Sequence, residues 1–421
     1  MQEPDIVVVG AGAAGIGAGL ELRERGIPFV ILEAAHRVGG RAHTDTRSLP
    51  VAWDRGCHWL HCADVNPLVP WADRLGAGYL REERIDAFAV WSGGRKLGRE
   101  EAAEARAGIE AAFAAVYAAA DADRDVPISE VVPNGGRWDA AARYILQLMA
   151  CEDAERVSAR GYGDYEDTGV NWPVVSGYGD LVTRMAEGLP VRLGVRVTGV
   201  GKTPRGVRVE TPDGAIGAKA AIVTVSTNVL ASGAIAFGTG SARDLLDHAA
   251  HVPCGAYEKV AIAFSRSPVG DGPERFCMVE PGDGSFPLDF QIAPGGQPVM
   301  IAHMAGSLAR DLAAAGEAAM TAAALDRLAA AFGSDVQKQV RATAVTGWQN
   351  DPFVLGGYSY VTPGAYQRRR QMIAADTGAI AFAGEAFSPA WQATAHGAYQ
   401  TGRDAAARLA SRLVAKRTPP G

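Results

Sequence analysis

A glycine-rich turn near the N-terminus has the residue types and spacing needed to hold a pyrophosphate. The β-branched run at residues 6–9 predicts a buried parallel strand, and it ends directly at Gly10-Ala11-Gly12-Ala13-Ala14-Gly15. In a G-x-G-x-x-G turn the first glycine permits the tight turn, the second lets the backbone approach phosphate, and the third lets a helix pack on the strand. The N-terminus of that helix then faces the negative charge. Alone, the motif is weak evidence, because such a turn can also be purely structural.

An acidic residue follows where a nucleotide-binding βαβ unit requires one. Residues 16–25 have helical composition, the helix stops at Gly26, and a second strand over residues 28–32 ends in Glu33. A carboxylate about 20 positions beyond the first glycine can accept hydrogen bonds from both ribose hydroxyls of an adenosine, and it would repel the 2′-phosphate of NADP. The predicted dinucleotide site contains Gly10, Gly12, Ala14, Gly15 and Glu33.

A second glycine-rich turn favours FAD over NAD. Arg37, Gly39, Gly40 and Arg41 follow shortly after Glu33 in the sequence Arg37-Val38-Gly39-Gly40-Arg41. The two glycines allow close approach of the backbone, and Arg41 can pair with a diphosphate. Two solvated surface charges are the alternative interpretation. Because the turn accompanies an independent nucleotide fingerprint, we predict that it contacts FAD.

Lys259 is a candidate for chemistry elsewhere in the chain. It precedes the apolar, strand-like run at residues 260–264. A buried ammonium in such a strand is costly unless it is hydrogen-bonded or deprotonated, and lysines perturbed in this way are typical of active sites. An edge-strand lysine that points into solvent is the alternative.

Several elements must come together to position these residues. A strand over residues 379–383 ends in Gly384-Glu385, and Gly397 and Ala398 open the last helix. Residues 195–200 and 206–210 alternate apolar and polar, with a turn at 212–214, and predict a small antiparallel ribbon. Residues 98–161 are alanine-rich and helical in period, with amphipathic stretches at 100–120 and 139–149. Because nucleotide motifs occur near both ends, the nucleotide-binding domain must be discontinuous.

With these motifs in place, the chain resembles the FAD-dependent amine oxidase family, and most closely its polyamine oxidases. The resemblance runs through nearly the whole sequence in the order of the family. It rests on the following segments: Arg37 to Arg41; Asp54-Arg55-Gly56-Cys57-His58-Trp59-Leu60-His61 with Asn66-Pro67; Ala221 to Val225; Tyr257-Glu258-Lys259-Val260; Trp348 with Gly356-Gly357-Tyr358-Ser359-Tyr360; Phe382-Ala383-Gly384-Glu385; Ala393 to Ala398; and Gly402-Arg403.

The resemblance implies a fold class and a domain organisation. The class is α/β: a discontinuous Rossmann-like FAD-binding domain with an α+β substrate-binding domain of mixed sheet and covering helices. We expect the FAD-binding domain at residues 1–64, 174–245 and 376–416, and the substrate-binding domain at 65–173 and 246–375.

The resemblance also implies roles for residues in the reaction. Lys259 would hold a water beside flavin N5, and Tyr358 would form one wall of an aromatic cage around the amine. Thr394 occupies the place of the second wall, which suggests a wider or more polar pocket. His61 would hydrogen-bond a substrate nitrogen, although a lone histidine is often structural.

Cofactor contacts are implied at further positions. Glu385, after Gly384, would bond the ribityl and phosphate region, and the helix start at Gly397 and Ala398 would face the flavin pyrimidine ring. Gly357 stands where monoamine oxidases have the cysteine that bonds the flavin, so we expect non-covalent FAD. Further expected contacts, of which Trp59 and Trp348 can equally be core packing, are Gly56, His58, Trp59, Val197 and Trp348.

Composition excludes other classes. The 421 residues carry a net charge of −6, with no basic run longer than residues 368–370, so nucleic acid is not an expected partner. Five cysteines without C-x-x-C spacing indicate neither a disulfide framework nor a zinc site, and no metal is expected. The sequence has neither a signal-peptide pattern nor a membrane span or C-terminal anchor, so we expect a cytoplasmic protein.

The predicted function is amine oxidation: hydride transfer from the carbon next to an amine nitrogen to flavin N5, giving an imine that water hydrolyses, with hydrogen peroxide released on reoxidation by O₂. One alternative is a desaturase or protoporphyrinogen oxidase, which shares the N-terminal fingerprint; another is a catalytically silent flavoprotein that serves as a binding partner. A polyamine, an aryl-alkyl amine and an amino acid all remain open as substrates. The oligomeric state and any role of Cys57 are also open.

Overall fold

A five-stranded parallel sheet forms around the N-terminal strand of the protein, whose computed structural model describes residues 4–81, 88–269, 275–281 and 285–417. The strand order is β20-β13-β1-β2-β9, and every neighbouring pair is parallel. Its strands come from segments far apart in the sequence. They are β1 (Ile6–Val9), β2 (Phe29–Leu32), β9 (Val191–Arg192), β13 (Ala220–Val223) and β20 (Ile380–Phe382).

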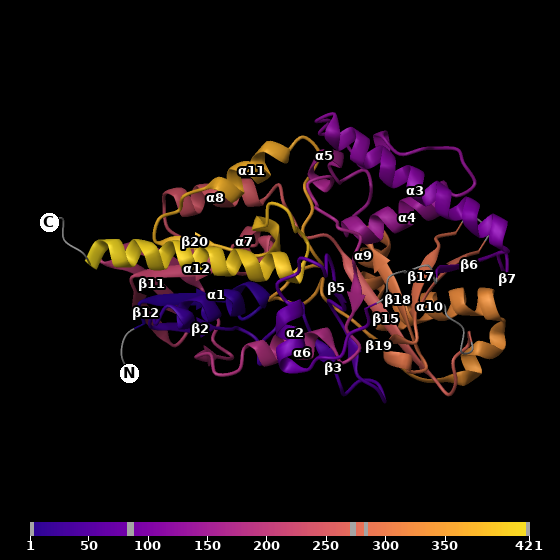
Figure 1. Ribbon diagram of the computed structural model, residues 1–421, viewed down its shortest axis with the longest axis horizontal. Helices are drawn as coiled ribbons and strands as arrows, with labels where there is room; N and C mark the ends of the chain where they lie inside the picture. Colours follow the sequence, from indigo (N-terminus) through magenta and orange to yellow (C-terminus); the bar gives the residue numbers. More distant parts are fainter. Residues whose placement is uncertain (1–3, 82–87, 270–274, 282–284, 418–421) are drawn as a thin grey trace.

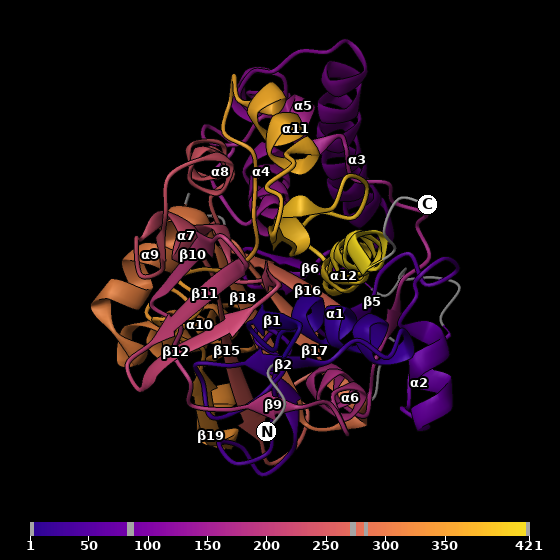
Figure 2. The same cartoon turned by 90° about the vertical axis from the view of Figure 1, so that its left-hand side faces the viewer.

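The two faces of this sheet pack against different layers. Ile6 and Val8 of β1 join one apolar core and Val7 and Val9 join another, which explains why the strand is apolar throughout. Figures 1 and 2 both show α1 and α12 side by side on one face. The helices of the first core are α1 (Ala13–Glu24), α2 (Val69–Leu75), α6 (Tyr178–Met185) and α12 (Ala395–Arg417), and those of the second are α7 (Thr227–Ala231), α8 (Ser241–Ala249) and α11 (Tyr366–Ala374).

The predicted ribbon is present as part of a four-stranded sheet of order β12-β11-β10-β14. Residues 195–198 were expected in it and lie outside its strands. The Val195 N–H donates to the carbonyl of Glu33 (2.8 Å) and holds the start of this stretch beside β2, whereas the Thr198 N–H already donates to the carbonyl of Glu210 in the ribbon (2.8 Å). The strands are β10 (Gly199–Thr203), β11 (Gly206–Thr211), β12 (Gly214–Ala218) and β14 (Ala236–Phe237); two short ribbons pair β3 (Thr44–Asp45) with β4 (Trp53–Asp54) and β5 (Trp59–Leu60) with β8 (Trp172–Pro173).

A mixed seven-stranded sheet occupies the other half of the molecule (Figure 1), in the order β19-β15-β18-β17-β16-β6-β7. Only the β16–β6 pair among them is parallel. The strands are β6 (Phe88–Ser92), β7 (Arg95–Lys96), β15 (Tyr257–Phe264), β16 (Phe276–Glu280), β17 (Leu288–Ile292), β18 (Val299–Ala305) and β19 (Val340–Val345).

Helices cover one face of this second sheet. Val260 and Ile262 of β15 pack into the core beneath these helices, whereas Ala261 packs on the opposite face together with Trp53. The predicted amphipathic helices at 100–120 and 139–149 are confirmed as α3 and α4. The covering helices are α3 (Arg99–Asp121), α4 (Asp139–Ala150), α9 (Gly306–Ala315) and α10 (Glu317–Phe332). The short helix α5 (Ala159–Tyr162) and the 3₁₀ turn η1 (Ile128–Glu130) pack against α3 and α4. Further 3₁₀ turns are η2 (Pro294–Gly296), η3 (Ser334–Gln339) and η4 (Glu385–Phe387), the last of which packs in the second core of the parallel sheet.

The predicted fold class is therefore confirmed, and the domain boundaries proposed from the sequence remain a prediction. All strands of the five-stranded sheet fall in the segments assigned to FAD binding, and all strands of the seven-stranded sheet fall in those assigned to the substrate. None of the described helices is long and apolar enough to cross a membrane. No disulfide joins the five cysteines, all of which the structure describes, and the described residues contain no cluster of side chains suited to a metal ion.

Candidate active site

A cavity of about 890 Å³ lies where the carboxyl ends of the parallel strands meet the seven-stranded sheet at Lys259, and residues of α3 and α4 also line it. Open α/β sheets bind their ligands at this edge. Both halves of the molecule therefore contribute to one cavity. The sequence-predicted residues that line it are Gly10, Gly12, Ala14, Glu33, Arg37, Gly39, Gly40, Arg41, Gly56, His58, Trp59, His61, Val197, Lys259, Trp348, Tyr358, Gly384, Glu385, Thr394 and Ala398.

Gly15 and Gly397 were also predicted to contact the cofactor, but neither is among the residues that line the cavity. A Cβ atom on Gly15 would lie 1.9 Å from the carbonyl oxygen of Gly10, and one on Gly397 would lie 2.0 Å from that of Trp391. Both glycines are needed for close packing of the backbone behind the cavity wall. They shape the site without facing it.

The turn after β1 forms a cradle for a dinucleotide. Gly10 has φ of +100°, a conformation that favours glycine, and a Cβ on Gly40 would lie 3.3 Å from the Cα of Gly12. Glu33 is buried at the end of β2, where its carboxylate accepts hydrogen bonds from the backbone N–H groups of Ala11 (2.7 Å) and Ala35 (2.8 Å). Side chains are thus absent where a pyrophosphate must approach, and a carboxylate with remaining lone pairs stands where ribose hydroxyls can donate. These residues fit the ADP half of FAD.

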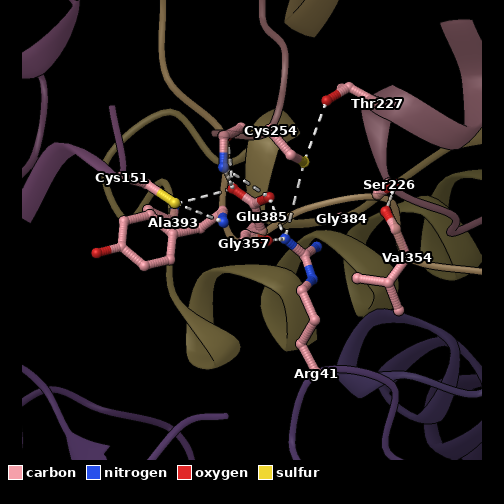
Figure 3. A network of polar contacts seen from close by, with 12 residues as sticks. Arg41, Cys151, Ser226, Thr227, Cys254, Val354, Gly357, Gly384, Glu385 and Ala393 are labelled. Carbon is pink, nitrogen blue, oxygen red and sulfur yellow. Dashed lines mark hydrogen bonds and ion pairs between the residues drawn. The ribbon is translucent and has the colours of Figure 1, made fainter. Parts of the chain in front are cut away.

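Arg41 is held by the protein rather than left free for a diphosphate. Figure 3 shows its guanidinium pointing at Glu385, to which Nη1 donates over 3.0 Å, and it also donates to the carbonyl of Gly357. Burial beside this carboxylate leaves the pKa of Arg41 above its ordinary value, because the attraction of Glu385 outweighs the desolvation. The Glu385 carboxylate accepts further bonds from the Ser359 hydroxyl (2.6 Å) and the Ala393 N–H (3.0 Å). Glu385 thereby ties three parts of the cavity wall together.

Arg37 and Trp348 lie together on the cavity wall. The guanidinium carbon of Arg37 is 6.0 Å from the centre of the Trp348 ring, and burial lowers the pKa of Arg37. The Trp348 indole N–H donates to the carbonyl of Arg55 (3.2 Å). Trp348 is therefore both packed in the protein and part of the wall, and Val197 joins the same wall.

Lys259 is fully surrounded at the boundary between the two halves. Its Nζ donates to the carbonyls of Gly56 (2.6 Å) and Asp54 (3.2 Å) and lies 3.2 Å from Nδ1 of His58. Burial lowers its pKa to about 8, only partly opposed by the attraction of Asp54 and Cys57. The strand therefore holds an amino group that can lose its proton near neutral pH. The alternative of a solvent-facing edge lysine is wrong, since only 2% of Lys259 is exposed and β15 pairs on both sides.

The predicted segment around Gly56 supplies the hydrogen-bond partners of the Lys259 amino group. A Cβ on Gly56 would lie 1.6 Å from the carbonyl oxygen of Arg41, so only glycine brings these two loops together. Burial lowers the pKa of His58 well below its ordinary value, so its imidazole is neutral. Trp59 stacks against Phe276, with ring centres 6.0 Å apart, and both line the cavity.

Three further predicted residues line the cavity away from the cradle. The Tyr358 ring lies 5.5 Å from that of Tyr257, and its hydroxyl donates to the carbonyl of Leu148. Thr394 accepts a hydrogen bond from the Gly397 N–H (3.0 Å), so its hydroxyl stabilises the start of α12. Nδ1 of His61 lies 2.8 Å from the amide oxygen of Asn171. Because that oxygen is an acceptor, Nδ1 donates to it, and Nε2 can accept a hydrogen bond.

Sequence reasoning missed several residues of the cavity. Asp289, His303, Tyr257 and Phe276 all line it from the seven-stranded sheet. The available signal was a polar residue inside an otherwise apolar strand, as in Leu288-Asp289-Phe290. Their proximity to Lys259 depends on strand register, which the sequence does not reveal.

Comparisons with known proteins place the chain among flavoproteins. It is 28% identical over 444 residues to polyamine oxidase 2 of Arabidopsis thaliana, covering 98% of this chain and 89% of the relative, and 27% identical over 453 residues to polyamine oxidase 4 of Oryza sativa subsp. japonica, covering 99% and 91%. The structure of cyclohexylamine oxidase from Brevibacterium oxydans IH-35A superimposes with a TM-score of 0.81 at 21% identity, covering 98% of this chain and all of that one. That likeness shows the fold.

A model of the family described as flavin-containing amine oxidoreductase matches residues 13–136 and 147–410. The match covers most of the chain and includes Glu33, Gly40, Lys259 and the segment around Tyr358. The cofactor is accordingly FAD, and its non-covalent binding agrees with glycine at position 357. The chain belongs to the flavin-containing amine oxidoreductase family.

Proposed function

We propose that the protein is an amine oxidase that removes a hydride from the carbon next to an amine nitrogen and uses dioxygen as the final acceptor. The observation that carries the proposal is Lys259, a buried amino group with a pKa of about 8 that lines the same cavity as the nucleotide cradle and the rings of Tyr257 and Tyr358. FAD held by these residues would supply the hydride acceptor and the path by which two electrons and two protons convert dioxygen into hydrogen peroxide.

The residues of the chain have separate tasks in this reaction. The cradle around Gly10 and Glu33 would hold the ADP half of the cofactor. Positively polarised N–H groups at the start of α12, around Ala398, would lie near the ring where negative charge gathers. Lys259 would hold or move a proton at Nζ, on the cavity side of its contacts with Gly56 and His58.

The substrate reacts in two steps, hydride loss and hydrolysis. A neutral amine loses a hydride and becomes an iminium cation, and water adds to this cation to give a carbonyl compound, an amine and a proton. Because a protonated amine has no lone pair to stabilise the cation, the reacting nitrogen must be neutral. The rate of the reductive half-reaction is therefore expected to rise with pH between about 6 and 9, and a flat profile would contradict hydride loss from the neutral amine.

An anaerobic titration tests the proposal directly. The purified holoenzyme is mixed with polyamines, aryl-alkyl amines and amino acids, and the absorbance of oxidised flavin is followed near about 450 nm. We expect at least one amine class to bleach the flavin and air to restore its colour with release of peroxide. Bleaching by a polyene or a porphyrinogen instead would favour the desaturase-type alternative. Flavin that no amine bleaches, in a protein isolated with a stable partner, would favour the catalytically silent alternative.

A further inference from the structure

Three polar side chains form a row across the seven-stranded sheet. Lys259 of β15 is paired with His303 of β18, and His303 is paired with Asp289 of β17. All three line the cavity. Since neighbouring strands lie about 4.8 Å apart, the backbone positions of Lys259 and Asp289 are roughly 10 Å apart. The cavity thus has a second polar position at a fixed distance from the lysine.

Asp289 is buried without a full set of partners. Only 6% of the residue is exposed, and Oδ1 has no hydrogen-bond partner among the described residues. No lysine or arginine of the described chain forms an ion pair with this carboxyl group that would explain its burial. Burial raises the pKa of Asp289 to about 8, and the backbone N–H of Phe290 opposes this only in part. A buried carboxyl group left in this state costs stability, so Oδ1 is open to a partner from outside the described residues.

His303 does not supply that partner. Its Nδ1 lies 2.9 Å from the Tyr257 hydroxyl, whereas its Nε2 is buried with no hydrogen-bond partner. Burial and the nearby Lys259 lower the pKa of His303 well below its ordinary value, so the ring is neutral and offers no positive charge to Asp289.

The charges along the cavity point to a cationic ligand. Its arginines, at positions 37, 41, 55 and 196, belong to segments at the nucleotide end or beside it. In the segments assigned to the substrate, the charged residues of the lining are Lys259 and the carboxylates Glu110, Asp167, Asp289 and Asp351. A substrate carboxylate would find no arginine there, whereas an ammonium would find carboxylates and the electron-rich faces of Tyr257 and Tyr358.

We propose that Asp289 is a specificity-determining residue that binds a second, positively charged nitrogen of the substrate, so that the enzyme prefers diamines and polyamines to monoamines and amino acids. The inference rests on the proposed function. The charged nitrogen pairs with the carboxylate, while a neutral nitrogen further along the molecule presents its neighbouring carbon for oxidation at the Lys259 end. No new bond is formed by Asp289, which acts only in binding and positioning.

The test compares α,ω-diamines of about four to eight carbons with monoamines of the same length, matched to the spacing of the row. In anaerobic flavin reduction we expect the wild-type holoenzyme to bind the best diamine at least about tenfold more tightly than its monoamine, as for a charge-assisted hydrogen bond. Asp289→Asn should abolish this preference while the limiting rate of reduction at saturation changes less than about threefold. Asp289→Glu keeps the charge and should retain a preference, shifted in chain length.

Calorimetry on enzyme that has been reduced beforehand measures the same binding without turnover. A diamine preference that disappears in Asp289→Asn supports the proposal, with unchanged FAD content and circular dichroism as controls for folding. A wild-type protein that binds both members of each pair equally would overturn it. So would a preference that survives Asp289→Asn but is lost in Asp167→Asn, which removes a more exposed carboxylate on the same cavity. If no amine reduces the wild-type flavin, the proposed function fails, yet the calorimetric comparison still decides the role of Asp289.

Discussion

The amino group of Lys259 lies among hydrogen-bond acceptors, yet burial works against its charge. The carbonyls of Gly56 and Asp54 stabilise the ammonium, whereas desolvation lowers its pKa to about 8. Because both protonation states are accessible near neutral pH, Lys259 can take up or release a proton during turnover. A methionine of similar length cannot do so.

We therefore expect Lys259→Met to bind FAD and to lower the rate of flavin reduction or reoxidation by roughly 100-fold, as is common for loss of a proton-transfer group. Stopped-flow absorbance of each half-reaction measures the effect. Lys338→Met, which changes an exposed lysine in η3, is the matched control and should leave both rates unchanged. Unaltered rates in Lys259→Met would remove Lys259 from the mechanism.

The raised pKa of Asp289 predicts that the free energy of unfolding depends on pH. Its folded pKa of about 8 lies above the ordinary value of 3.8, so between these values the folded protein binds more protons than the unfolded chain. The contribution of Asp289 to the free energy of unfolding therefore falls as pH rises from about 4 to 8. Asp289→Asn removes this loss and should stabilise the protein by roughly 1–3 kcal/mol near pH 8, and by little near pH 4.

Thermal unfolding of both proteins across this pH range, with FAD in excess, measures the difference. Other titrating groups cancel because they are common to both proteins. A difference in unfolding temperature that does not grow with pH would show that Asp289 is already paired or exposed in the folded state.

The sequence predicted site residues only where they belong to short motifs of neighbouring residues. Gly10 and Glu33 belong to one βαβ unit, and Lys259 and Tyr358 lie in recognisable segments. Asp289 and His303 are single polar residues in apolar strands, and only the pairing of β15, β18 and β17 brings them beside Lys259. Strand register depends on the packing of the whole sheet, so local patterns do not contain it.

At the scale of elements, α1 and α12 approach each other through glycines. A Cβ on Gly402 of α12 would lie 1.9 Å from the carbonyl oxygen of Ala14 in α1. Glycine to alanine inside a helix ordinarily stabilises it by about 1 kcal/mol. Here the added methyl group must push the two helices apart, and Ala14 and Ala398 at their N-termini both line the cavity.

Gly402→Ala should therefore destabilise the protein by roughly 1–3 kcal/mol and weaken FAD binding. Unfolding temperature and the FAD dissociation constant are the measurements. Gly217→Ala in β12 is the matched control, since its Cβ would meet no atom within 4 Å, and it should change neither quantity appreciably. A stabilised Gly402→Ala protein would mean that the helices lie further apart than the structure has them.

Elements were predicted more reliably than their ends. The helix expected at residues 16–25 begins at Ala13, because Gly12 is already its N-cap and the turn and helix share residues. Residues 195–198 alternate like a strand, but Val195 is hydrogen-bonded to Glu33 at the end of β2, and the regular pairing of the ribbon begins only after Thr198. In both places the end of the helix or strand depends on contacts with another part of the fold. The periodicity of the sequence contains no information about those contacts.

At the scale of the molecule, the cavity exists only because the strand ends of one sheet meet a second sheet, and both sheets are built from interleaved segments of the chain. The cradle comes from residues before 60, whereas Lys259 and Asp289 come from the middle of the chain. Motifs near both ends of the sequence were enough to predict this discontinuity. The depth and charge of the cavity were not predictable, because they depend on side chains contributed by strands that pair only in the folded protein.

Since both halves line one cavity, the cofactor should stabilise the molecule as a unit. A ligand bound only by the folded state adds about 2.7 kcal/mol to the free energy of unfolding at a concentration 100 times its dissociation constant. We expect removal of FAD to lower the unfolding temperature, and added FAD to restore it in a concentration-dependent way. FMN lacks the adenosine half that the cradle of Gly10 and Glu33 fits, so at equal concentration it should stabilise far less. Differential scanning calorimetry of the apoprotein with each flavin makes the comparison, and equal stabilisation by FMN would show that the cradle contributes little to cofactor binding.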